Sequence, residues 1–375
     1  MRIMFVQKRM DSRGGSEIQS IKLAKKFSQR GHQIFFWSHN VDFEIYPELK
    51  ASPQIIKLLK SHSNSKWLFS LINEIKIIKP DIVYTRDTRR LFVYTIICRL
   101  LSVPLIYNIN HDVKAMPYNL SQLNNIIYRD SRAYGFFPMW AVFGYFATKC
   151  YPYLSKMVSQ TNSQREFLNS KKIDSITIYN GHELPSSLTN LRSERRIIAW
   201  VGSLKKEIKR PHLFLLISKN CRHLEFGFKY CGNLTDNKSY IEYLMKTTKI
   251  LGNVEYLGEL SVSEVGDLLE KSYIMINTSK VESFPNTFIE AWSRGVPVIS
   301  LSVDPDNIIS EEGLGFKESN ITGIIDKIEY LLRNADQYND ISKKARNFAI
   351  KNFDLDIIAD KYISTFIKTI KDYES

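Results

Sequence analysis

The chain has 375 residues, with 52 Lys and Arg against 39 Asp and Glu, and a formal net charge of +13. Its hydrophobic fraction of 44% and aromatic fraction of 12% exclude an intrinsically disordered chain. The length predicts about two domains, each large enough to bury a sizeable core.

The positive charge is concentrated in the first half of the chain. Residues 1–180 hold 26 Lys and Arg and 12 Asp and Glu, a balance of +14, whereas residues 181–375 hold 26 and 27, a balance of −1. Such asymmetry points to an anionic partner for the first half, which leaves nucleic acid, a membrane surface and a phosphorylated substrate open.

The four cysteines, Cys98, Cys150, Cys221 and Cys231, form no C-x-x-C pair and lie in apolar surroundings. We therefore expect buried, reduced thiols rather than a disulfide framework or a zinc site, which is consistent with a cytoplasmic location.

Two apolar segments bear on targeting and membrane contact. The N-terminal run, Ile3–Val6, is too short for a signal peptide, and we expect it to be a strand. The aromatic-rich segment over residues 134–153 is followed by Lys156 and contains Lys149, but its apolar part is too short for a transmembrane helix. A core helix and an interfacial membrane anchor are both open for it.

Short apolar runs alternate along the chain with longer segments in which apolar residues recur at helical spacing. The runs predict strands, in chain order, over residues 3–6, 33–37, 81–84, 104–108, 197–202, 226–231, 254–257, 273–277 and 296–300. The segments between them predict helices, including one from Ser16 to Gly31 and others over residues 67–78 and 91–101. This alternation is typical of parallel sheets with helices on both faces.

The alternation runs twice, which predicts an α/β protein of two doubly wound, Rossmann-like parallel-sheet domains facing across a cleft. We expect an N-terminal domain over residues 1–182, a polar linker over residues 183–196 and a C-terminal domain over residues 197–353. The amphipathic tail over residues 354–373 predicts a terminal helix or helix pair, with packing back on the N-terminal domain left open.

Ligands bind such sheets at the carboxyl ends of the strands, where three loops carry candidate residues. In the loop after the first strand, Gly14 and Gly15 allow the backbone to approach a ligand closely, and the following helix favours an anion. An ordinary turn is the alternative for these two glycines.

The second loop follows the strand over residues 197–202 and carries four cations within six residues: Lys205, Lys206, Lys209 and Arg210. A solvated loop and a phosphate site are equally open for this charge run.

The third loop, over residues 281–291, opens a helix after the strand over residues 273–277. Its backbone N–H groups around Phe284–Phe288 can hold a diphosphate, although Asn286 or Thr287 can instead cap the helix. Glu282 precedes the helix and Glu290 lies in its first turn. Because a carboxylate accepts two hydrogen bonds from a vicinal diol, one glutamate suits a ribose and the other a sugar ring.

The sequence over Glu282–Pro297, E-S-F-P-N-T-F-I-E-A-W-S-R-G-V-P, resembles the donor-binding signature of glycosyltransferase family 4. Members of that family are retaining, nucleotide-sugar-dependent enzymes of the GT-B fold. The turn Asn180-Gly181-His182, the pair Val201-Gly202 and the segment over residues 313–316 follow the family's order and rough spacing.

The resemblance implies roles for individual residues. It implies His111 and Glu282 as catalytic residues beside the donor sugar, and Glu290 as the ligand of the ribose. Lys209 would neutralise the diphosphate, and the other implied donor contacts are Gly14, Gly15, Phe284, Pro285, Asn286 and Thr287. The family often has Arg after Gly202, where this chain has Ser203, so Lys205, Lys206 or Arg210 is a candidate for the missing phosphate contact. Ser203 itself is also a possible phosphate contact.

The implied reaction is retaining transfer of a sugar from a nucleotide-diphosphate sugar to an acceptor hydroxyl, with no metal and no other cofactor. Asp304 and Asp306 resemble a metal-binding D-x-D motif, but they lie beyond the donor helix, so we expect no metal site. The family also implies a glycan or lipid-linked acceptor in bacterial surface polysaccharide or lipopolysaccharide assembly. That role predicts a cytoplasmic protein in contact with the anionic inner face of the membrane.

Two alternatives remain at this point. A nucleotide-sugar epimerase would share the fold and the donor site but would need no acceptor. A basic nucleic-acid-binding protein would explain the charge, but the sequence has no zinc finger, no RNP-like aromatic motif and no Arg-rich arm, so we expect no nucleic-acid partner.

Overall fold

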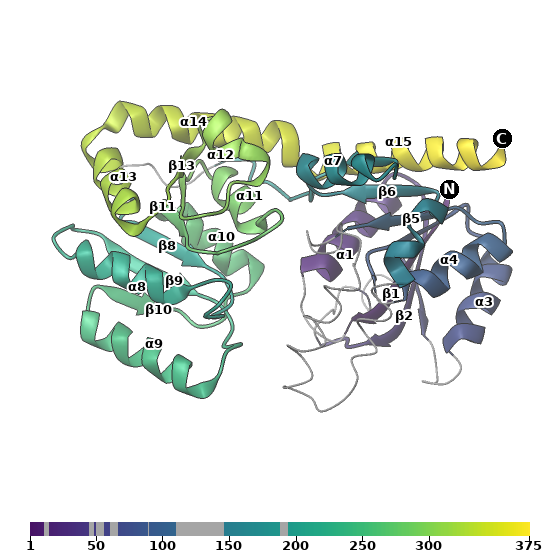
Figure 1. Cartoon of the computed structure of the whole chain (residues 1–375), viewed down its shortest axis with the longest axis horizontal. Helices are drawn as coiled ribbons and strands as arrows, with labels where there is room; N and C mark the ends of the chain where they lie inside the picture. Colours follow the sequence, from purple (N-terminus) through teal and green to yellow (C-terminus); the bar gives the residue numbers. More distant parts are fainter. Residues whose placement is uncertain are drawn as a thin grey trace. The chain divides into compact units, whose positions relative to one another are not determined.

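The computed structural model describes residues 1–10, 15–44, 49, 56–60, 67–88, 90–109, 146–187 and 194–375. The chain forms two compact units (Figure 1). The first unit comprises Met1–Gly181 together with Leu355–Ser375, and the second comprises His182–Asp354.

The first unit is built on a seven-stranded parallel sheet with the strand order β3-β2-β1-β4-β5-β6-β7. Ile3 pairs with Ile34 on one side and with Ile82 on the other, so β1 is central. The strands are β1 Arg2–Met10, β2 Gln33–Val41, β3 Ile56–Lys60, β4 Ile82–Thr85, β5 Leu105–Asn108, β6 Lys156–Ser159 and β7 Ser175–Thr177. The N-terminal strand thus extends four residues beyond the predicted Val6.

Successive residues of β1 enter two different cores, because side chains of a strand alternate between the faces of its sheet. Phe5 lies in a core with α1 and α15, whereas Met4 lies in a core with α3 and α4. The helices of this unit are α1 Gly15–Gln29, α3 Trp67–Ile78, α4 Leu91–Leu100, η2 Tyr151–Tyr153, α7 Asn162–Ser170 and α15 Leu355–Glu374.

The C-terminal helix α15 (yellow in Figure 1) packs on the first unit. Its buried Tyr362 makes edge-to-face contacts with Phe27 and Tyr84. On its exposed side, Asp360 accepts a hydrogen bond from Arg30 at 2.9 Å. The apolar face of this tail therefore completes the core that α1 covers.

The second unit has a six-stranded parallel sheet with the order β10-β9-β8-β11-β12-β13. Its strands are β8 Ile197–Val201, β9 Gly227–Cys231, β10 Val254–Tyr256, β11 Ser272–Asn277, β12 Val298–Ser300 and β13 Gly315–Lys317. Its helices are α8 Pro211–Asn220, α9 Lys238–Leu251, α10 Val262–Glu270, α11 Asn286–Trp292, η4 Pro305–Asn307, α12 Ile308–Glu311, α13 Ile321–Arg333 and α14 Ala335–Phe353.

The two doubly wound α/β sheets confirm the predicted fold class. All four cysteines are free and buried, as expected from their apolar surroundings. Residues 134–145 of the aromatic segment lie outside the described residues, whereas Phe146–Lys149 is helical. Within the described residues, none of the helices combines the length and the apolar character that crossing a membrane requires.

Candidate functional site

The order of the second sheet marks where a ligand is expected. β8 lies between β9 and β11, so the chain reverses its direction of winding at β8. Open α/β sheets bind ligands outside the carboxyl ends of the strands at such a switch point. The loop over residues 202–210 follows β8, and the loop over residues 278–285 follows β11.

Hydrogen bonds tie these two loops together. The backbone N–H of Lys280 donates to the Ile208 carbonyl at 2.7 Å, and the Thr278 hydroxyl donates to the Lys209 carbonyl at 2.7 Å. The guanidinium of Arg210 donates back to the Thr278 carbonyl at 2.7 Å. The switch point is therefore a fixed platform.

Lys209 and Glu282, both predicted from the sequence, meet on this platform. The Nζ atom of Lys209 lies 2.6 Å from Glu282 Oε2, and Asn277 Nδ2 donates to Glu282 Oε1 at 3.1 Å. Both charged side chains are partly buried. The site thus holds an ammonium and a carboxylate in contact, within reach of any ligand bound at the carboxyl end of β11.

Glu290 and Asn286 are brought together by a histidine that was not predicted to be a site residue. His182 is buried, with Nε2 at 3.3 Å from Asn286 Oδ1 and Nδ1 at 3.9 Å from Glu290 Oε1. Its backbone N–H donates to the Phe353 carbonyl at 2.8 Å. One side chain therefore positions two residues of the predicted donor motif.

The predicted turn over residues 284–287 opens α11. The prediction that Glu290 lies in the first turn of this helix is wrong, because the helix begins at Asn286 and its first turn holds no acidic residue. Pro285 is the N-cap residue, and no side chain caps the helix. The alternative in which Asn286 or Thr287 caps α11 is therefore wrong, because the helix already begins at Asn286, whose side chain contacts His182. Phe284 is buried against the rings of Trp292 and Phe353, so its side chain anchors the turn.

Three arginines hold the other end of α11. Arg294 donates to the Glu290 carbonyl at 3.0 Å, Arg195 donates to the Arg294 carbonyl at 2.8 Å, and Arg346 donates to the Ser293 carbonyl. Burial lowers the pKa of the Arg294 guanidinium. Cations suit this position because the last carbonyls of a helix carry partial negative charge.

The cations proposed to replace the missing family arginine differ in their surroundings. Arg210 has a left-handed φ of 53° and donates to Thr278, Ser279 and Ser302, and burial lowers its pKa. Lys205 is exposed, two residues after Ser203 in the same loop. The structure therefore gives Arg210 a bracing position, whereas Lys205 is accessible to a ligand.

The glycine after β9 fixes the shape of this platform. Gly232 has a φ of 145°, and a Cβ atom there would lie 1.9 Å from the Gly202 carbonyl oxygen. The Gly202 N–H donates to the Cys231 carbonyl at 3.1 Å. The loops after β8 and β9 therefore contact each other through their backbones, which only glycine at position 232 permits.

The first unit has its own polar cluster at the carboxyl edge of its sheet. Buried Arg86, which follows β4, donates to Asn108 Oδ1 at 3.1 and 3.2 Å and to Asn180 Oδ1 at 2.8 Å. Gly15 is the first residue of α1, after β1. Gly14 and His111 lie outside the described residues. Arg86 was not predicted, although a charged residue directly after a strand is a usable signal.

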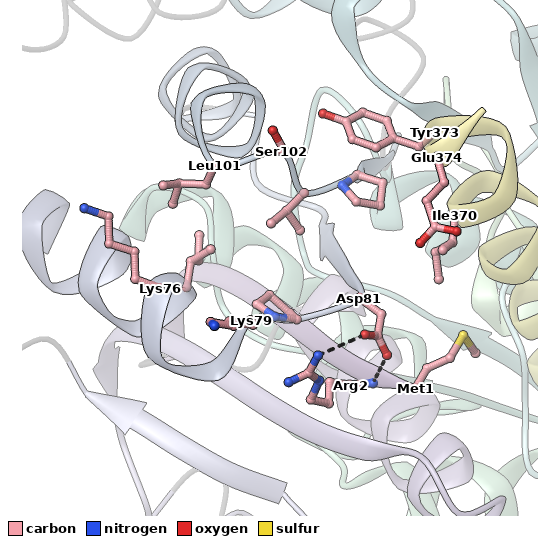
Figure 2. Close-up of a pocket in the computed structure, with 14 residues that line it drawn as sticks. Met1, Arg2, Lys76, Lys79, Asp81, Leu101, Ser102, Ile370, Tyr373 and Glu374 are labelled. Carbon is pink, nitrogen blue, oxygen red and sulfur yellow. Dashed lines mark hydrogen bonds and ion pairs between the residues drawn. The ribbon is translucent and has the colours of Figure 1, made fainter.

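A hollow of about 610 Å³ lies in the first unit, at the opposite edge of the sheet (Figure 2). Arg2, Asp81 and Pro104, which stand at the amino ends of β1, β4 and β5, line it. No group of three metal-ligating side chains occurs among the described residues. Asp304 accepts hydrogen bonds from Ile309 N and Ser310 Oγ at the start of α12.

The second unit contains a region that matches a known protein family. Residues 187–348 match the sequence model of the family described as glycosyl transferases, group 1. We call this region, which is similar to group 1 glycosyltransferases, the glycosyltransferase module. The match contains Lys209, Glu282 and Glu290, so the resemblance predicted from Glu282–Pro297 is confirmed.

The chain is also similar to a curated protein, the N-acetyl-alpha-D-glucosaminyl L-malate synthase of Bacillus anthracis, with 24% identity over 188 residues. That match covers 49% of this chain and 45% of the other. The chain spans less than half the length of the curated relatives it matches.

Solved structures resemble the whole chain. HepE of Anabaena, in complex with UDP-glucose, has a TM-score of 0.75 at 15% identity, covering 98% of this chain and 100% of that one. A glycosyltransferase from Rickettsia africae has a TM-score of 0.77 at 20% identity, covering 99% and 98%. These similarities show that the glycosyltransferase module and the first unit together have the GT-B fold.

Proposed function

We propose that the chain transfers a sugar from a nucleotide-diphosphate sugar to an acceptor hydroxyl, with retention of the anomeric configuration. The observation that carries the proposal is the contact between Lys209 and Glu282 at the switch point of the second sheet, with Glu290 on the helix that follows the loop of Glu282. Each stands on a loop or helix that other contacts within the second unit hold in place.

The charges suit a nucleotide diphosphate. The Lys209 ammonium and the positive end of the α11 dipole would stabilise the negative charge that develops on the leaving diphosphate. Glu290 would accept hydrogen bonds from the ribose diol, and Glu282 from the transferred sugar. Because these groups supply positive charge to the diphosphate, we propose a reaction without a metal or another cofactor.

The retaining course rests on the family resemblance. Retaining hydrolases flank the anomeric carbon with two carboxylates about 5–5.5 Å apart. In this chain, we propose instead that the departing diphosphate helps to deprotonate the acceptor hydroxyl on the same face of the sugar. His111, which lies outside the described residues, is proposed to contact the donor sugar.

We further propose a glycan or lipid-linked acceptor in bacterial surface polysaccharide or lipopolysaccharide assembly, at the cytoplasmic face of the membrane. The excess of positive charge over residues 1–180 supports an anionic partner for the first unit. The epimerase alternative is not favoured, because the family match is to transferases. An epimerase would convert a free nucleotide sugar without an acceptor, so product analysis with the donor alone distinguishes the two.

Thermal unfolding with a panel of nucleotide sugars tests the proposal. A donor that binds the folded chain must raise its melting temperature, by mass action. We expect at least one nucleotide sugar to do so, and we expect Glu290→Ala to abolish the shift while Glu225→Ala, an exposed site on the same unit, keeps it. Absence of a shift with every nucleotide sugar, or an unchanged shift in Glu290→Ala, would overturn the assignment.

A further inference from the structure

The net charge of the protein resides in one of its units. Residues 1–181 and 355–375 together hold 29 Lys and Arg and 16 Asp and Glu, a balance of +13. Residues 182–354 hold 23 of each and are neutral. An anionic surface is therefore attracted to the first unit alone.

Large aliphatic side chains are exposed where α3 and α4 end. Ile77 is 67% exposed in the last turn of α3, and Leu100 is 78% exposed at the end of α4. Ile96, one turn before Leu100, is 43% exposed. The opposite side of α4 buries Tyr94 and Ile97 in the core, so this helix is apolar on its packed side and on its outer side.

Cations stand among these aliphatic side chains. Lys76 precedes Ile77, and Arg99 precedes Leu100. Lys79 lies two residues after Ile77 and has a left-handed φ of 48°. The Arg99 guanidinium lies over the ring of Tyr153 at 5.5 Å, and Tyr153 is 57% exposed. Of the ion pairs formed between described residues, none includes these three cations.

The hollow of about 610 Å³ lies directly beside these residues. Lys76 and Lys79 line one side of it, Leu101 and Ser102 another, and Tyr373 the wall formed by α15 (Figure 2). Four apolar residues also line the hollow: Ile75, Val103, Pro104 and Ile370. Two carboxylates also line it: Asp81, which accepts from the Arg2 backbone N–H at 2.7 Å, and exposed Glu374.

We propose that this surface docks on an anionic lipid bilayer. We call it the basic apolar face, and it comprises Lys76, Ile77, Lys79, Ile96, Arg99, Leu100 and Tyr153. Exposed aliphatic and aromatic side chains enter the boundary between headgroups and acyl chains, while lysine and arginine meet lipid phosphates. A nucleic acid would use the cations but not the aliphatic side chains, so the combination favours lipid.

The basic apolar face would bring the enzyme to a lipid-linked acceptor. The acceptor rests on the proposed function, whereas docking on the bilayer does not. The hollow beside Lys76 and Lys79 would receive a headgroup phosphate. The surface lies at the amino edge of the first sheet, so its occupation leaves the carboxyl edge, where the polar cluster of Arg86 lies, unobstructed.

Co-sedimentation of the full chain with vesicles tests the proposal. We expect binding to vesicles of phosphatidylcholine mixed with phosphatidylglycerol, and little binding to phosphatidylcholine alone. Ile77→Ser/Leu100→Ser and Lys76→Gln/Lys79→Gln should each weaken binding roughly tenfold or more, as expected for the loss of two anchoring groups. Raised salt should weaken the wild type as well.

A matched pair on the second unit is the control. Ile250 of α9 is 67% exposed, as Ile77 is, and it follows Lys249 as Ile77 follows Lys76. Lys249→Gln/Ile250→Ser should leave vesicle binding unchanged. Equal losses in the two units, no loss in either face variant, or failure of the wild type to bind anionic vesicles would overturn the proposal.

Two further measurements separate this inference from the proposed function. The thermal shift with a nucleotide sugar, measured without vesicles, should be the same in the wild type and in both face variants. A shift that persists without vesicle binding would overturn the docking face and leave the donor site standing. Retention of the wild type on RNA at physiological salt, with no vesicle binding, would also overturn the docking face.

Discussion

The two units share one winding pattern but place different chemistry at the carboxyl edges of their sheets. In the second unit, Lys209 and Glu282 form a partly buried ion pair. In the first unit, Arg86 is buried and donates to the side-chain amides of Asn108 and Asn180. The same fold therefore places a polar site at the same edge of both sheets, and the residues at the strand ends give each site its own chemistry.

The largest effect is expected from removing the Lys209 ammonium of the second unit. Lys209→Met should lower kcat by about 100-fold or more, because it removes electrostatic stabilisation of the leaving diphosphate. Steady-state kinetics with the donor identified by thermal shift measures this effect. Lys219→Met, at an exposed site in the last turn of α8, is the control. A kcat within threefold or so of the wild type would remove Lys209 from the mechanism.

The corresponding change in the first unit should act on stability. Arg86→Met removes the donor shared by Asn108 and Asn180 and should lower the free energy of unfolding by about 2 kcal/mol. Urea unfolding measures this loss, with Arg165→Met at an exposed site of α7 as the control. If both variants lost the same small amount, Arg86 would not hold the polar cluster together.

His182 sharpens the comparison, because its side chain contacts two residues of the donor motif. His182→Ala should raise the KM for the donor roughly tenfold with a smaller change in kcat, since Asn286 and Glu290 lose their positioning contact. His182→Gln, which keeps an amide donor near Asn286, should recover part of the loss. His223→Ala, at an exposed site, should behave as the wild type. If kcat and the KM for the donor changed to the same extent in all three variants, the role of His182 would be merely structural.

The smallest effect is expected from the cysteines, which are alike in the two units. Burial raises the pKa of Cys98 and Cys231 to about 12 and that of Cys221 to about 11. Because the thiolate is the reactive form, the native chain should resist alkylation near neutral pH, as mass spectrometry would show. Rapid labelling of native Cys98 or Cys231 would contradict their burial.

The same thiols bear on stability at high pH. A folded-state pKa raised above the unfolded value means that the protonated thiols stabilise the fold below the ordinary value of 9.0. That contribution is lost as the pH rises from there through about 12, so the chain should become easier to unfold in this range.

The sequence predicts the fold well because strand and helix periods are local. Alternating runs identified central strands such as β1, β8 and β11, and the spacing of Glu282 and Glu290 placed both in one loop-and-helix unit. The strands β3, β6, β7 and β13 were not identified, because they are short or lie in polar surroundings. Their positions depend on neighbouring strands rather than on their own pattern.

The site was predicted less completely, because its contacts join distant parts of the chain. Lys209 and Glu282 were both predicted, but their ion pair depends on β8 lying beside β11. His182 contacts Asn286 only because the chain enters the second unit next to Phe353. The exposure of Leu100 could not be predicted either, because the apolar sequence of α4 is typical of a helix buried on all sides.

The place of α15 has a consequence for how the protein is made. Tyr362 and Phe366 fill the core beneath α1, yet they are synthesised after the whole second unit. Domains generally fold in the order in which they leave the ribosome, so the second unit can be complete while the earlier one still exposes Phe27 and Tyr84. The first unit is thus the first to be synthesised and the last to complete its core.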